Sequence, residues 1–317
     1  MPRISRRTFL ATVTAAAAGA AIAAPSSKKK NLAILILDGT GPLAPHQSAY
    51  ALQRGHTVTV FNRGARDEAL PAKVEYLDGS RNGDYAPLAN RTWDVVIDNA
   101  AASQPRWVRS VALHIQSARQ YIFLSDEIGE AESDVMSLFG KRATIVRAAA
   151  LAGEGDKTDR FTYWPVRIAG GGEVLAPGDP NGAAAFIDVR DLAEWMIRIA
   201  EKQTIGTFDA ISIVPMHELL EGIRTVVNSN ARFTWVTPEF LTANAAKLPV
   251  WSTREWKPRD AVAQGLTYRP LKDTVESTLH WHLSRDPNRQ AALRAGITRE
   301  RETELLAEWK KQKENAG

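Results

Sequence analysis

The stretch Leu32-Ala-Ile-Leu-Ile-Leu37, followed by Asp38-Gly39-Thr40-Gly41, decides the fold class of this chain. A continuous apolar run of this length is typical of a strand buried on both faces of a parallel sheet. Pro45 then opens an expected helix that stops at Gly55, and Thr57-Val-Thr-Val-Phe61 is the expected second strand. Together these segments predict a βαβ unit of about thirty residues.

Further apolar runs of strand length continue this alternation. Residues 93–98, 121–125 and 143–147 are expected strands, and an amphipathic stretch at about 107–119 separates the first two. Strands that alternate with helical segments predict an α/β fold with a doubly wound, Rossmann-like parallel sheet. Ligands of such sheets bind beyond the carboxyl ends of the strands.

The pattern loosens after residue 150, where glycine and proline turns become frequent. Asp191 is the expected cap of a helix over residues 192–202. The division that we predict is a signal peptide (1–24), a dinucleotide-binding domain (31–150), the remaining sheet elements with a smaller C-terminal substrate lobe (151–290), and a charged C-terminal helix (291–317).

The first residues have the features of a twin-arginine export signal. Arg6 and Arg7 form the arginine pair, and an Ala-rich stretch runs from Phe9 to about Ala24. A transmembrane helix needs about 20 apolar residues, whereas the apolar part of a signal peptide is shorter. A signal peptide also needs a cleavage site of small residues, which lies here near Ala23. The alternative is an amphipathic N-terminal helix. The sequence predicts a partner, the twin-arginine export machinery, a periplasmic location and no stable membrane anchor.

The charge of the chain is small once this signal is removed. The formal net charge falls from +4 to +1, because Arg3, Arg6 and Arg7 are the charged residues of the first 23. A near-neutral chain without a basic stripe gives no electrostatic footprint for nucleic acid. There is no cysteine for a disulfide or a thiolate metal site, and the histidines lack metal-ligand spacing, so we expect no metal site.

The turn after the first strand is a candidate for binding a diphosphate. Glycines at such a turn let backbone amides and the helix N-terminus approach phosphate groups without a side-chain collision. Gly39, Thr40, Gly41 and Leu43 are the candidate contacts from this turn.

With these motifs, the chain resembles the NAD-dependent epimerase/dehydratase family, the extended and atypical short-chain dehydrogenases, over about residues 32–309. The matching segments are Gly39-Thr-Gly41, Phe61-Asn-Arg-Gly64, residues 93–98, Tyr121-Ile-Phe-Leu-Ser125, residues 160–166, residues 172–178 and Phe186-Ile-Asp-Val-Arg-Asp-Leu192. The resemblance implies a nicotinamide dinucleotide as cofactor and a small polar, sugar-like substrate. The further cofactor contacts that it implies are Asn62, Arg63, Arg81, Asn99 and Ala100.

The cofactor motif departs from the family pattern in the loop after the first strand and at the end of the second strand. Asp38 stands at the first glycine of the family's loop and Ala44 at the third, and a carboxylate would repel a diphosphate unless it points away or pairs with a cation. A degenerate loop with weak or no dinucleotide binding is therefore an alternative. Asn62-Arg63 replaces the acid of NAD-preferring proteins, and a guanidinium suits a 2′-phosphate, so NADP is favoured over NAD. A solvated surface arginine is the other interpretation.

The family's catalytic motif is missing at its usual place. The resemblance implies a hydroxyl donor after the strand that ends at Ser125, and then a Tyr-x-x-x-Lys helix whose lysine lowers the pKa of the tyrosine. Asp126 stands at the hydroxyl position instead, and no Tyr-x-x-x-Lys precedes the strand at 143–147. Ser125 and Asp126 are the candidate catalytic residues. Asp126, Glu127 and Glu130 form an acidic cluster in which a carboxyl with a raised pKa could act as acid or base. The alternative is that these three residues form a solvated acidic loop.

Arg160, Tyr163 and Trp164 are the candidate substrate contacts, because they could grip and stack on a sugar or another polar ring. A surface turn next to core aromatics is the alternative. Two functions follow from the sequence. One is an exported NAD(P)-dependent oxidoreductase or epimerase-like enzyme, and the other is a binding protein that kept the fold and lost the Ser/Tyr/Lys machinery.

Overall fold

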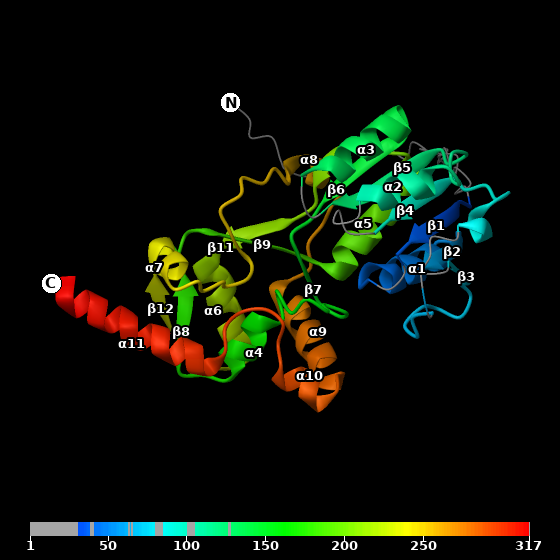
Figure 1. The fold of residues 1–317 in the computed structure, drawn as a ribbon. Helices are drawn as coiled ribbons and strands as arrows, with labels where there is room; N and C mark the ends of the chain where they lie inside the picture. Colours follow the sequence, from blue (N-terminus) through cyan, green and yellow to red (C-terminus); the bar gives the residue numbers. More distant parts are fainter. Residues whose placement is uncertain are drawn as a thin grey trace, which may run out of the picture. The chain divides into compact units, whose positions relative to one another are not determined.

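The predicted doubly wound sheet is present (Figure 1). A computed structural model describes residues 31–38, 41–62, 64, 66–79, 85–99, 105–125 and 128–316, in which seven parallel strands pair in the order β10-β6-β5-β4-β1-β2-β3. The strands are β1 (Ala33–Leu37), β2 (Thr57–Asn62), β3 (Glu75–Asp78), β4 (Val95–Asp98), β5 (Gln120–Ser125), β6 (Ala143–Arg147) and β10 (Gly206–Asp209). The fold class predicted from the sequence is confirmed. The predicted export signal, residues 1–24, lies outside the described residues.

Alternation along the central strands explains why β1 is apolar throughout. In β1, Ile34 and Ile36 belong to the core on one face of the sheet, and Leu35 and Leu37 belong to the core on the other. All four side chains are fully buried. Because successive residues of a strand point to opposite faces, a strand covered on both sides must be apolar at every position.

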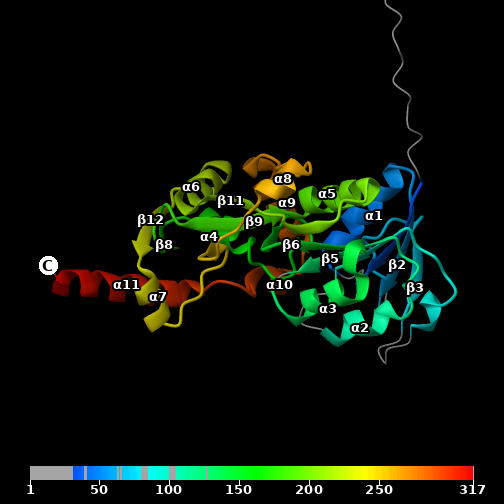
Figure 2. The ribbon, with the colours of Figure 1, turned by 90° about the horizontal axis from the view of Figure 1, so that it is seen from above.

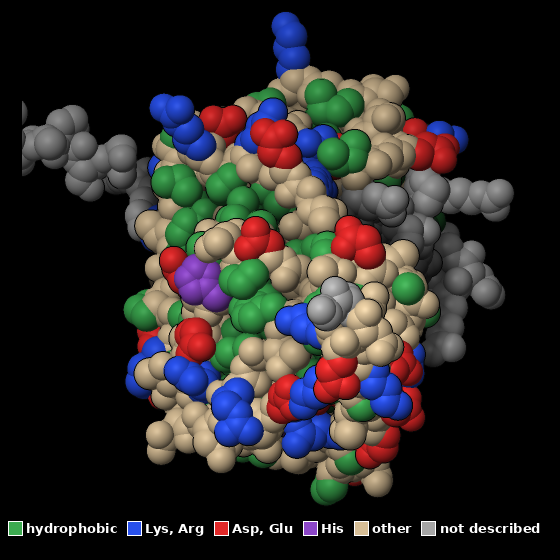
Figure 3. Space-filling model, turned by 90° about the vertical axis from the view of Figure 1, so that its left-hand side faces the viewer, with side chains coloured by type: hydrophobic (Ala, Val, Ile, Leu, Met, Phe, Trp, Pro, Cys, Tyr) green, Lys and Arg blue, Asp and Glu red, His purple; other side chains and the backbone are tan. Residues whose placement is uncertain are grey.

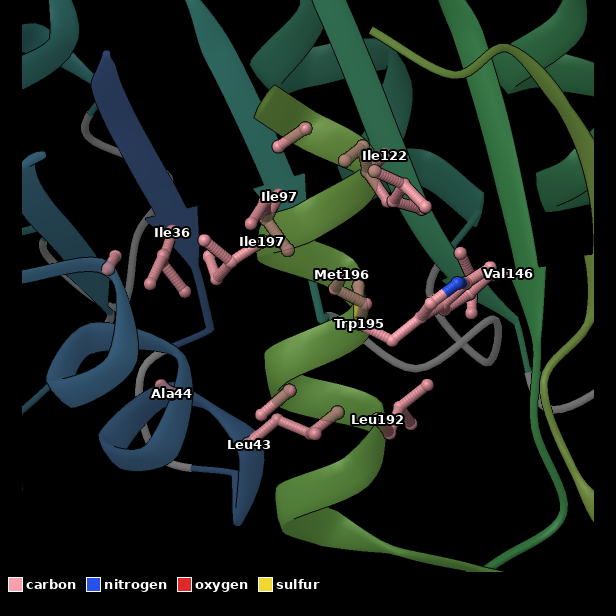
Figure 4. Packing of buried hydrophobic residues seen from close by; sticks show 14 of the residues in the cluster. Ile36, Leu43, Ala44, Ile97, Ile122, Val146, Leu192, Trp195, Met196 and Ile197 are labelled. Atoms are coloured by element: carbon pink, nitrogen blue, oxygen red, sulfur yellow. The ribbon is translucent and has the colours of Figure 1, made fainter. Parts of the chain in front are cut away.

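Helices α1 (Leu43–Gln53) and α5 (Val189–Lys202) cover one face of the sheet (Figure 2). Figure 4 shows α1 and α5 side by side in front of the strands, with Trp195 and Met196 in the shared core. Leu43 of α1 packs into the same cluster. Helix α1 begins at Leu43 rather than at Pro45, and its N-cap is Pro42.

The opposite face of the sheet is covered by α2 (Pro105–Ala112) and α3 (Glu130–Phe139), with short 3-10 turns η1 (Ala86–Leu88) and η2 (Gly140–Arg142) (Figure 2). Phe139 at the end of α3 stacks on Tyr121 of β5, with ring centroids 4.0 Å apart and nearly parallel planes. Helix α3 is short, and its last residue, Phe139, brings the chain back to the sheet just before β6 begins at Ala143.

Asp188, and not Asp191, caps α5. The Asp188 carboxylate accepts a hydrogen bond from the backbone N–H of Arg190, which is the capping geometry. Asp191 lies in the first helical turn, where its carboxylate accepts the backbone N–H of Arg269. The prediction of the cap at Asp191 is therefore wrong, because β9 runs straight into the helix without an intervening loop.

The second lobe contains two smaller sheets and most of the remaining helices (Figure 1). Its strands are β7 (Ala150–Ala152), β8 (Glu173–Pro177), β9 (Ala183–Asp188), β11 (Ser212–Pro215), β12 (Arg232–Val236) and β13 (Trp251–Ser252). Its helices are α4 (Tyr163–Ala169), α6 (Met216–Val226), α7 (Pro238–Ala243), α8 (Arg259–Ala263), α9 (Leu271–Ser284), α10 (Pro287–Ala291) and α11 (Arg299–Ala316). Strand β9 pairs with β7, β11 and β13, and β12 pairs with β8.

Helix α11 lies within the segment predicted as a charged C-terminal helix and is attached to this lobe by a buried ion pair. The Arg167 guanidinium donates to the Glu302 carboxylate at 2.5 Å, and both side chains are almost fully buried. The other oxygen of Glu302 accepts the backbone N–H of Leu175 in β8. Pairing and hydrogen bonds offset the cost of burying both charges.

The surface of the molecule carries both signs of charge. On the face drawn in Figure 3, hydrophobic side chains gather over the upper part, and Lys and Arg are interspersed with Asp and Glu over the lower part. The basic side chains of that face do not form a continuous stripe. None of the helices in the described ranges has the length and apolar character needed to cross a bilayer.

Candidate functional site

The turn between β1 and α1 keeps the backbone conformation of a glycine position at Asp38. Asp38 has φ of 60°, in the left-handed region, and its N–H donates to the carbonyl of Phe61 at 3.2 Å. Aspartate tolerates this region better than most side chains, so Asp38 can replace glycine without reshaping the turn. Gly39 and Thr40 lie outside the described residues. A Cβ added at Gly41 would not be crowded, since the nearest atom is the Asp38 carbonyl oxygen at 3.9 Å.

The amino terminus of α1 faces this turn without a side-chain cap from the described residues, and its first turn contains no acid. The N–H groups of Leu43 and Ala44 lie at this terminus, and such unpaired amides attract anions. The segment after β7 lies against the same turn: a Cβ on Gly155 would be 2.9 Å from the Cβ of Pro42. Next to it, burial lowers the pKa of His46, and the neighbouring Glu154 carboxylate opposes this shift.

Two buried amides connect α1 to the carboxyl end of β4. Gln47 Nε2 donates to Asn99 Oδ1 at 3.2 Å, and Asn99 Nδ2 donates to Gln47 Oε1 at 2.8 Å. Gln47 also donates to the sulfur of Met196 in α5. Asn99 was expected to contact a cofactor, but its side chain is committed to this reciprocal pair. Ala100 lies outside the described residues, and Gln47 was not predicted.

The carboxyl ends of β2 and β3 lie side by side, as the adenine end of a dinucleotide would require. Asn62 ends β2 and is buried, and Asp78 ends β3, where its carboxylate accepts the backbone N–H of Gly64 at 3.2 Å. Arg63 and Arg81, the two arginines expected at this place, are outside the described residues.

A charged cluster occupies the carboxyl ends of β5 and β6. The buried Ser125 hydroxyl donates to Glu132 of α3 at 2.7 Å. Arg147, the last residue of β6, donates to both oxygens of the same carboxylate, at 2.9 and 2.6 Å. Burial raises the pKa of Glu132, but the hydrogen bonds from Arg147 and Ser125 outweigh it and leave the pKa below its usual value.

This cluster changes the role of Ser125. Its hydroxyl is used to hold an ionised carboxylate, and the side chain is fully buried, so Ser125 is placed to position Glu132 rather than to reach a substrate. Sequence reasoning did not identify Glu132 or Arg147. The sequence did contain a signal for this ion pair, because Arg147 ends a buried apolar strand, and a cation in that position requires a partner of opposite charge.

Further charges lie at the carboxyl end of β10. The Asp209 carboxylate accepts the backbone N–H of Lys257 at 2.8 Å and is 3.9 Å from a guanidinium nitrogen of Arg254. The Arg254 guanidinium lies 3.7 Å from the centroid of the Trp256 ring. Its charge also contributes to lowering the pKa of Glu132, so the ends of β5, β6 and β10 form one electrostatic group. None of these residues was predicted.

The predicted acidic cluster is described only at Glu130, because Asp126 and Glu127 are outside the described residues. Glu130 is exposed and pairs with Arg109 at 3.1 Å, and Arg109 also pairs with Asp134 at 2.7 Å. Glu130 therefore belongs to a solvated ion-pair group between α2 and α3, and this does not favour a raised-pKa role for it.

The three predicted substrate contacts are placed differently from one another. Tyr163 and Trp164 are buried in the core of the second lobe, and the Trp164 indole donates to the Pro249 carbonyl at 2.9 Å. Burial raises the pKa of the Tyr163 hydroxyl, and its ring packs against Gly296. These placements match the core alternative and do not support substrate contact. Arg160 is exposed.

The spacing Tyr-x-x-x-Lys does occur once elsewhere, at Tyr268 and Lys272. Pro270 lies between them as the N-cap of α9, so the two residues do not share a helical face. The Tyr268 hydroxyl donates to the Ile211 carbonyl at 2.8 Å, and the Lys272 amine pairs with Glu276. This pair therefore does not replace the family's tyrosine and lysine.

Two cavities adjoin β11. One of about 250 Å³ is lined by Asp188, Asp191 and Arg269 among others, and these charges pair with one another or with neighbouring side chains. The other, of about 730 Å³, is lined by the described residues Ser212, Ile213, Val214, Trp256, Lys257, Pro258, Arg259, Asp260, Val262 and Tyr268. Within the described ranges, no group of three or more His, Asp or Glu side chains could hold a metal ion.

Comparison with known proteins places the fold. The sequence matches no family model and no curated protein. Among solved structures, the chain is similar to the Bordetella bronchiseptica enzyme WbmH in complex with NAD+, with 15% identity, 80% of this chain and 99% of that chain covered, and a TM-score of 0.61.

Two further structures agree with this placement. The Bordetella bronchiseptica enzyme WbmG in complex with NAD and UDP has 14% identity, covers 86% of this chain and 99% of its own, and has a TM-score of 0.60. UDP-glucose 4-epimerase from Thermus thermophilus in complex with NAD has 14% identity, covers 78% of this chain and 98% of its own, and has a TM-score of 0.56. These three neighbours were crystallised with NAD, and at such identities the likeness establishes a shared fold alone.

Proposed function

We propose that this chain is an exported nicotinamide-dinucleotide-binding protein of the epimerase/dehydratase type that acts on a small polar, sugar-like substrate. The observation that carries the proposal is the turn between β1 and α1. Asp38 has a left-handed backbone there, and the α1 amino terminus has no side-chain cap from the described residues. Such a terminus is suited to a diphosphate. The structural neighbours crystallised with NAD support the same cofactor class.

The residues at this turn fit a dinucleotide. Gly41 leaves room for phosphate oxygens, and the amides of Leu43 and Ala44 supply donors, with Gly39 and Thr40 completing the turn. When bound, the dinucleotide would accept or donate a hydride. The Gln47–Asn99 pair holds α1 at a fixed position relative to β4, which keeps these donors in place.

NADP is the proposed form of the cofactor. Arg63 follows β2, where a guanidinium would pair with the 2′-phosphate, and Asn62 and Arg81 would lie on the adenine side. Arg63→Glu is expected to reverse a preference for NADP over NAD, which dinucleotide titrations of both proteins would measure. An unchanged preference would contradict the role of Arg63.

Asp126 is the proposed acid or base. It directly follows β5, at the edge of the sheet where ligands of this fold class bind. The Ser125 hydroxyl is already bound to Glu132, and Glu132 is bound by Arg147. Asp126→Asn should abolish turnover of an identified substrate and leave dinucleotide binding intact. Glu130→Gln, which changes an exposed acid nearby, is the matched control and should retain turnover.

The second candidate function is dinucleotide binding without catalysis. It is favoured by α3, which spans only Glu130–Phe139 between β5 and β6 and contains neither tyrosine nor lysine. An exported protein of this kind would act as a binding protein that retained the fold. If the wild type binds the dinucleotide but turns over no substrate, this function is favoured.

The proposal is tested by what the purified protein contains. The chain is isolated from the periplasm of the expressing cells and denatured, and the released nucleotide is identified by chromatography. We expect close to one NADP per chain, because a folded protein exported by the twin-arginine route would be loaded before export. If no dinucleotide is released and added NADP or NAD does not raise the melting temperature, the proposal fails.

A further inference from the structure

Arg254 is a partly buried cation whose guanidinium is held by stacking. Its side chain is 29% exposed, and its guanidinium stacks on the Trp256 ring at 3.7 Å. The nearest carboxylate oxygen, on Asp209, is 3.9 Å away, which is beyond hydrogen-bond distance. Within the part of the chain that the structure describes, no acceptor takes a hydrogen bond from this guanidinium. The stacking fixes the plane of the guanidinium and leaves its edge for a ligand.

Arg147 supplies a second cation to the same group. Its Nε and one terminal nitrogen are bound by Glu132, and the other terminal nitrogen makes no hydrogen bond to any described residue. The hydrogen bond with Glu132 has the largest effect in raising the pKa of Arg147, and the nearby Asp209 carboxylate raises this pKa further. The two arginines therefore share the carboxylates of Glu132 and Asp209 as counter-charges.

The cavity of about 730 Å³ borders this group. Trp256, which stacks on Arg254, lines it together with Tyr268, whose hydroxyl is fixed by the Ile211 carbonyl. Lys257 and Arg259 add two cations to the lining against the single acid Asp260. The lining thus combines two aromatic rings, which suit the C–H face of a sugar ring, with an excess of positive charge.

We propose that the sugar ring of the substrate binds in this cavity and that its anionic group, a carboxylate or phosphate, binds Arg254, which stacks on the lining residue Trp256 but does not itself line the cavity. The inference rests on the proposed function in taking the ligand to be the sugar-like substrate. Charge-assisted hydrogen bonds from a guanidinium to a carboxylate or phosphate are about twice as strong as neutral ones. A neutral sugar would leave the Arg254 donors without an anionic acceptor, so an anionic sugar should bind more tightly.

The test is calorimetric titration of the full chain with glucuronate, glucose 6-phosphate and glucose, each with and without saturating NADP. We expect at least one anionic sugar to bind about tenfold or more tightly than glucose, and the tighter of the two identifies the anion as carboxylate or phosphate. In Arg254→Gln this preference should fall to about the level of glucose, and Arg254→Lys should recover part of it. Added salt should weaken the preference.

Arg232→Gln is the matched control, because it removes one exposed arginine from β12 and should leave all affinities unchanged. Thermal unfolding of each variant checks that the fold is retained. If glucose binds as tightly as both anionic sugars, if none of the three binds, or if Arg254→Gln keeps the preference, the inference is overturned. An Arg254-dependent preference without NADP binding would uphold this site and overturn the dinucleotide proposal. NADP binding without the preference would do the reverse.

Discussion

The two halves of the carboxyl edge of the main sheet are built from different interactions. At β1 and β4, which we call the neutral half after its amide pair, Gln47 and Asn99 exchange two hydrogen bonds in a buried setting. The carboxylates of this half are Asp38, after β1, and the buried Asp98 of β4, which accepts a hydrogen bond from the Tyr121 hydroxyl. At β5 and β6 the polar side chains are charged, with Glu132 bound through both oxygens by Arg147. The neutral half leaves the positive end of α1 without a side-chain cap from the described residues, and the charged half holds fixed cations in place.

This difference matches two kinds of ligand group. A diphosphate can be bound by backbone amides and a helix terminus, which need no charged side chain. A substrate that must be distinguished from similar molecules needs side-chain donors held at fixed positions. Carboxylates such as Glu132 hold the arginines in place, so the charged half should respond more strongly to removal of one partner than the neutral half.

The largest effect is expected from Glu132→Gln. The substitution leaves Arg147, whose side chain is 23% exposed, without its carboxylate. Breaking a fully buried pair costs about 3–5 kcal/mol, and the partial exposure of Arg147 reduces the expected loss of unfolding free energy to about 3 kcal/mol. Urea denaturation measures it.

Glu130→Gln is the control on the same helix. Glu130 pairs with Arg109, and both side chains are more than half exposed, so the pair is screened by water. The expected loss is below about 0.5 kcal/mol. Equal losses in the two variants would mean that the cluster at β5 and β6 is not distinguished by its burial.

In the neutral half, Gln47→Met should cost about 2 kcal/mol, because it leaves the buried Asn99 amide without its partner. Asn99→Leu should cost a similar amount. The double variant should cost less than the sum of the single ones, since replacing both polar partners by apolar groups removes the unsatisfied group. Strict additivity in urea denaturation would show that the two amides do not act as a pair.

Gly155→Ala should have a smaller effect on stability and a specific effect on the β1–α1 turn. Gly155 has φ of 88°, and the new Cβ would press on Pro42 at 2.9 Å. We expect a loss of about 1.5 kcal/mol and weaker NADP binding in a fluorescence titration. Gly140→Ala, at the end of α3 on the opposite face of the sheet from α1, adds a Cβ at φ of 50° with no atom within 4 Å, so it should cost about 1 kcal/mol and leave NADP affinity unchanged. Equal NADP affinity in the two variants would mean that the contact between residue 155 and Pro42 does not affect NADP binding.

The central strands were predictable because each contains a run of mostly apolar residues. The run from Leu32 to Leu37 allows no other placement than a strand buried on both faces, and β1 confirms it within one residue. Strand β10 was missed, because Gly206-Thr-Phe-Asp209 is short and half polar, and only pairing with β6 identifies it. Edge strands are specified by their neighbours more than by their own residues.

The site was less predictable for a related reason. Tyr163 and Trp164 have side chains suited to a sugar, but the sequence does not tell a buried aromatic from an exposed one. The sheet brings together three distant segments, which contain Glu132, Arg147 and Arg254. The spacing of residues along the chain does not predict such contacts between distant segments. By contrast, the Gly-rich turn is a local feature, and its signal was visible in the sequence.

The smallest effect concerns the pH dependence of stability in the charged half. The pKa of Glu132 in the folded chain is below its ordinary value of 4.5, so at a pH between the two the unfolded chain binds more protons. The stability that Glu132 contributes is complete above pH 4.5 and is lost as the pH falls through the folded pKa. The Glu132→Gln variant has no titratable carboxyl at position 132. The difference in unfolding free energy between wild type and Glu132→Gln should therefore shrink as the pH falls below 4.5. Other carboxylates with lowered pKa values, such as Asp159 and Asp188, destabilise both proteins equally and cancel in this difference. A difference that stays constant over this range would mean that Arg147 does not stabilise the ionised form of Glu132, and the contrast between the two halves of the edge would then rest on geometry alone.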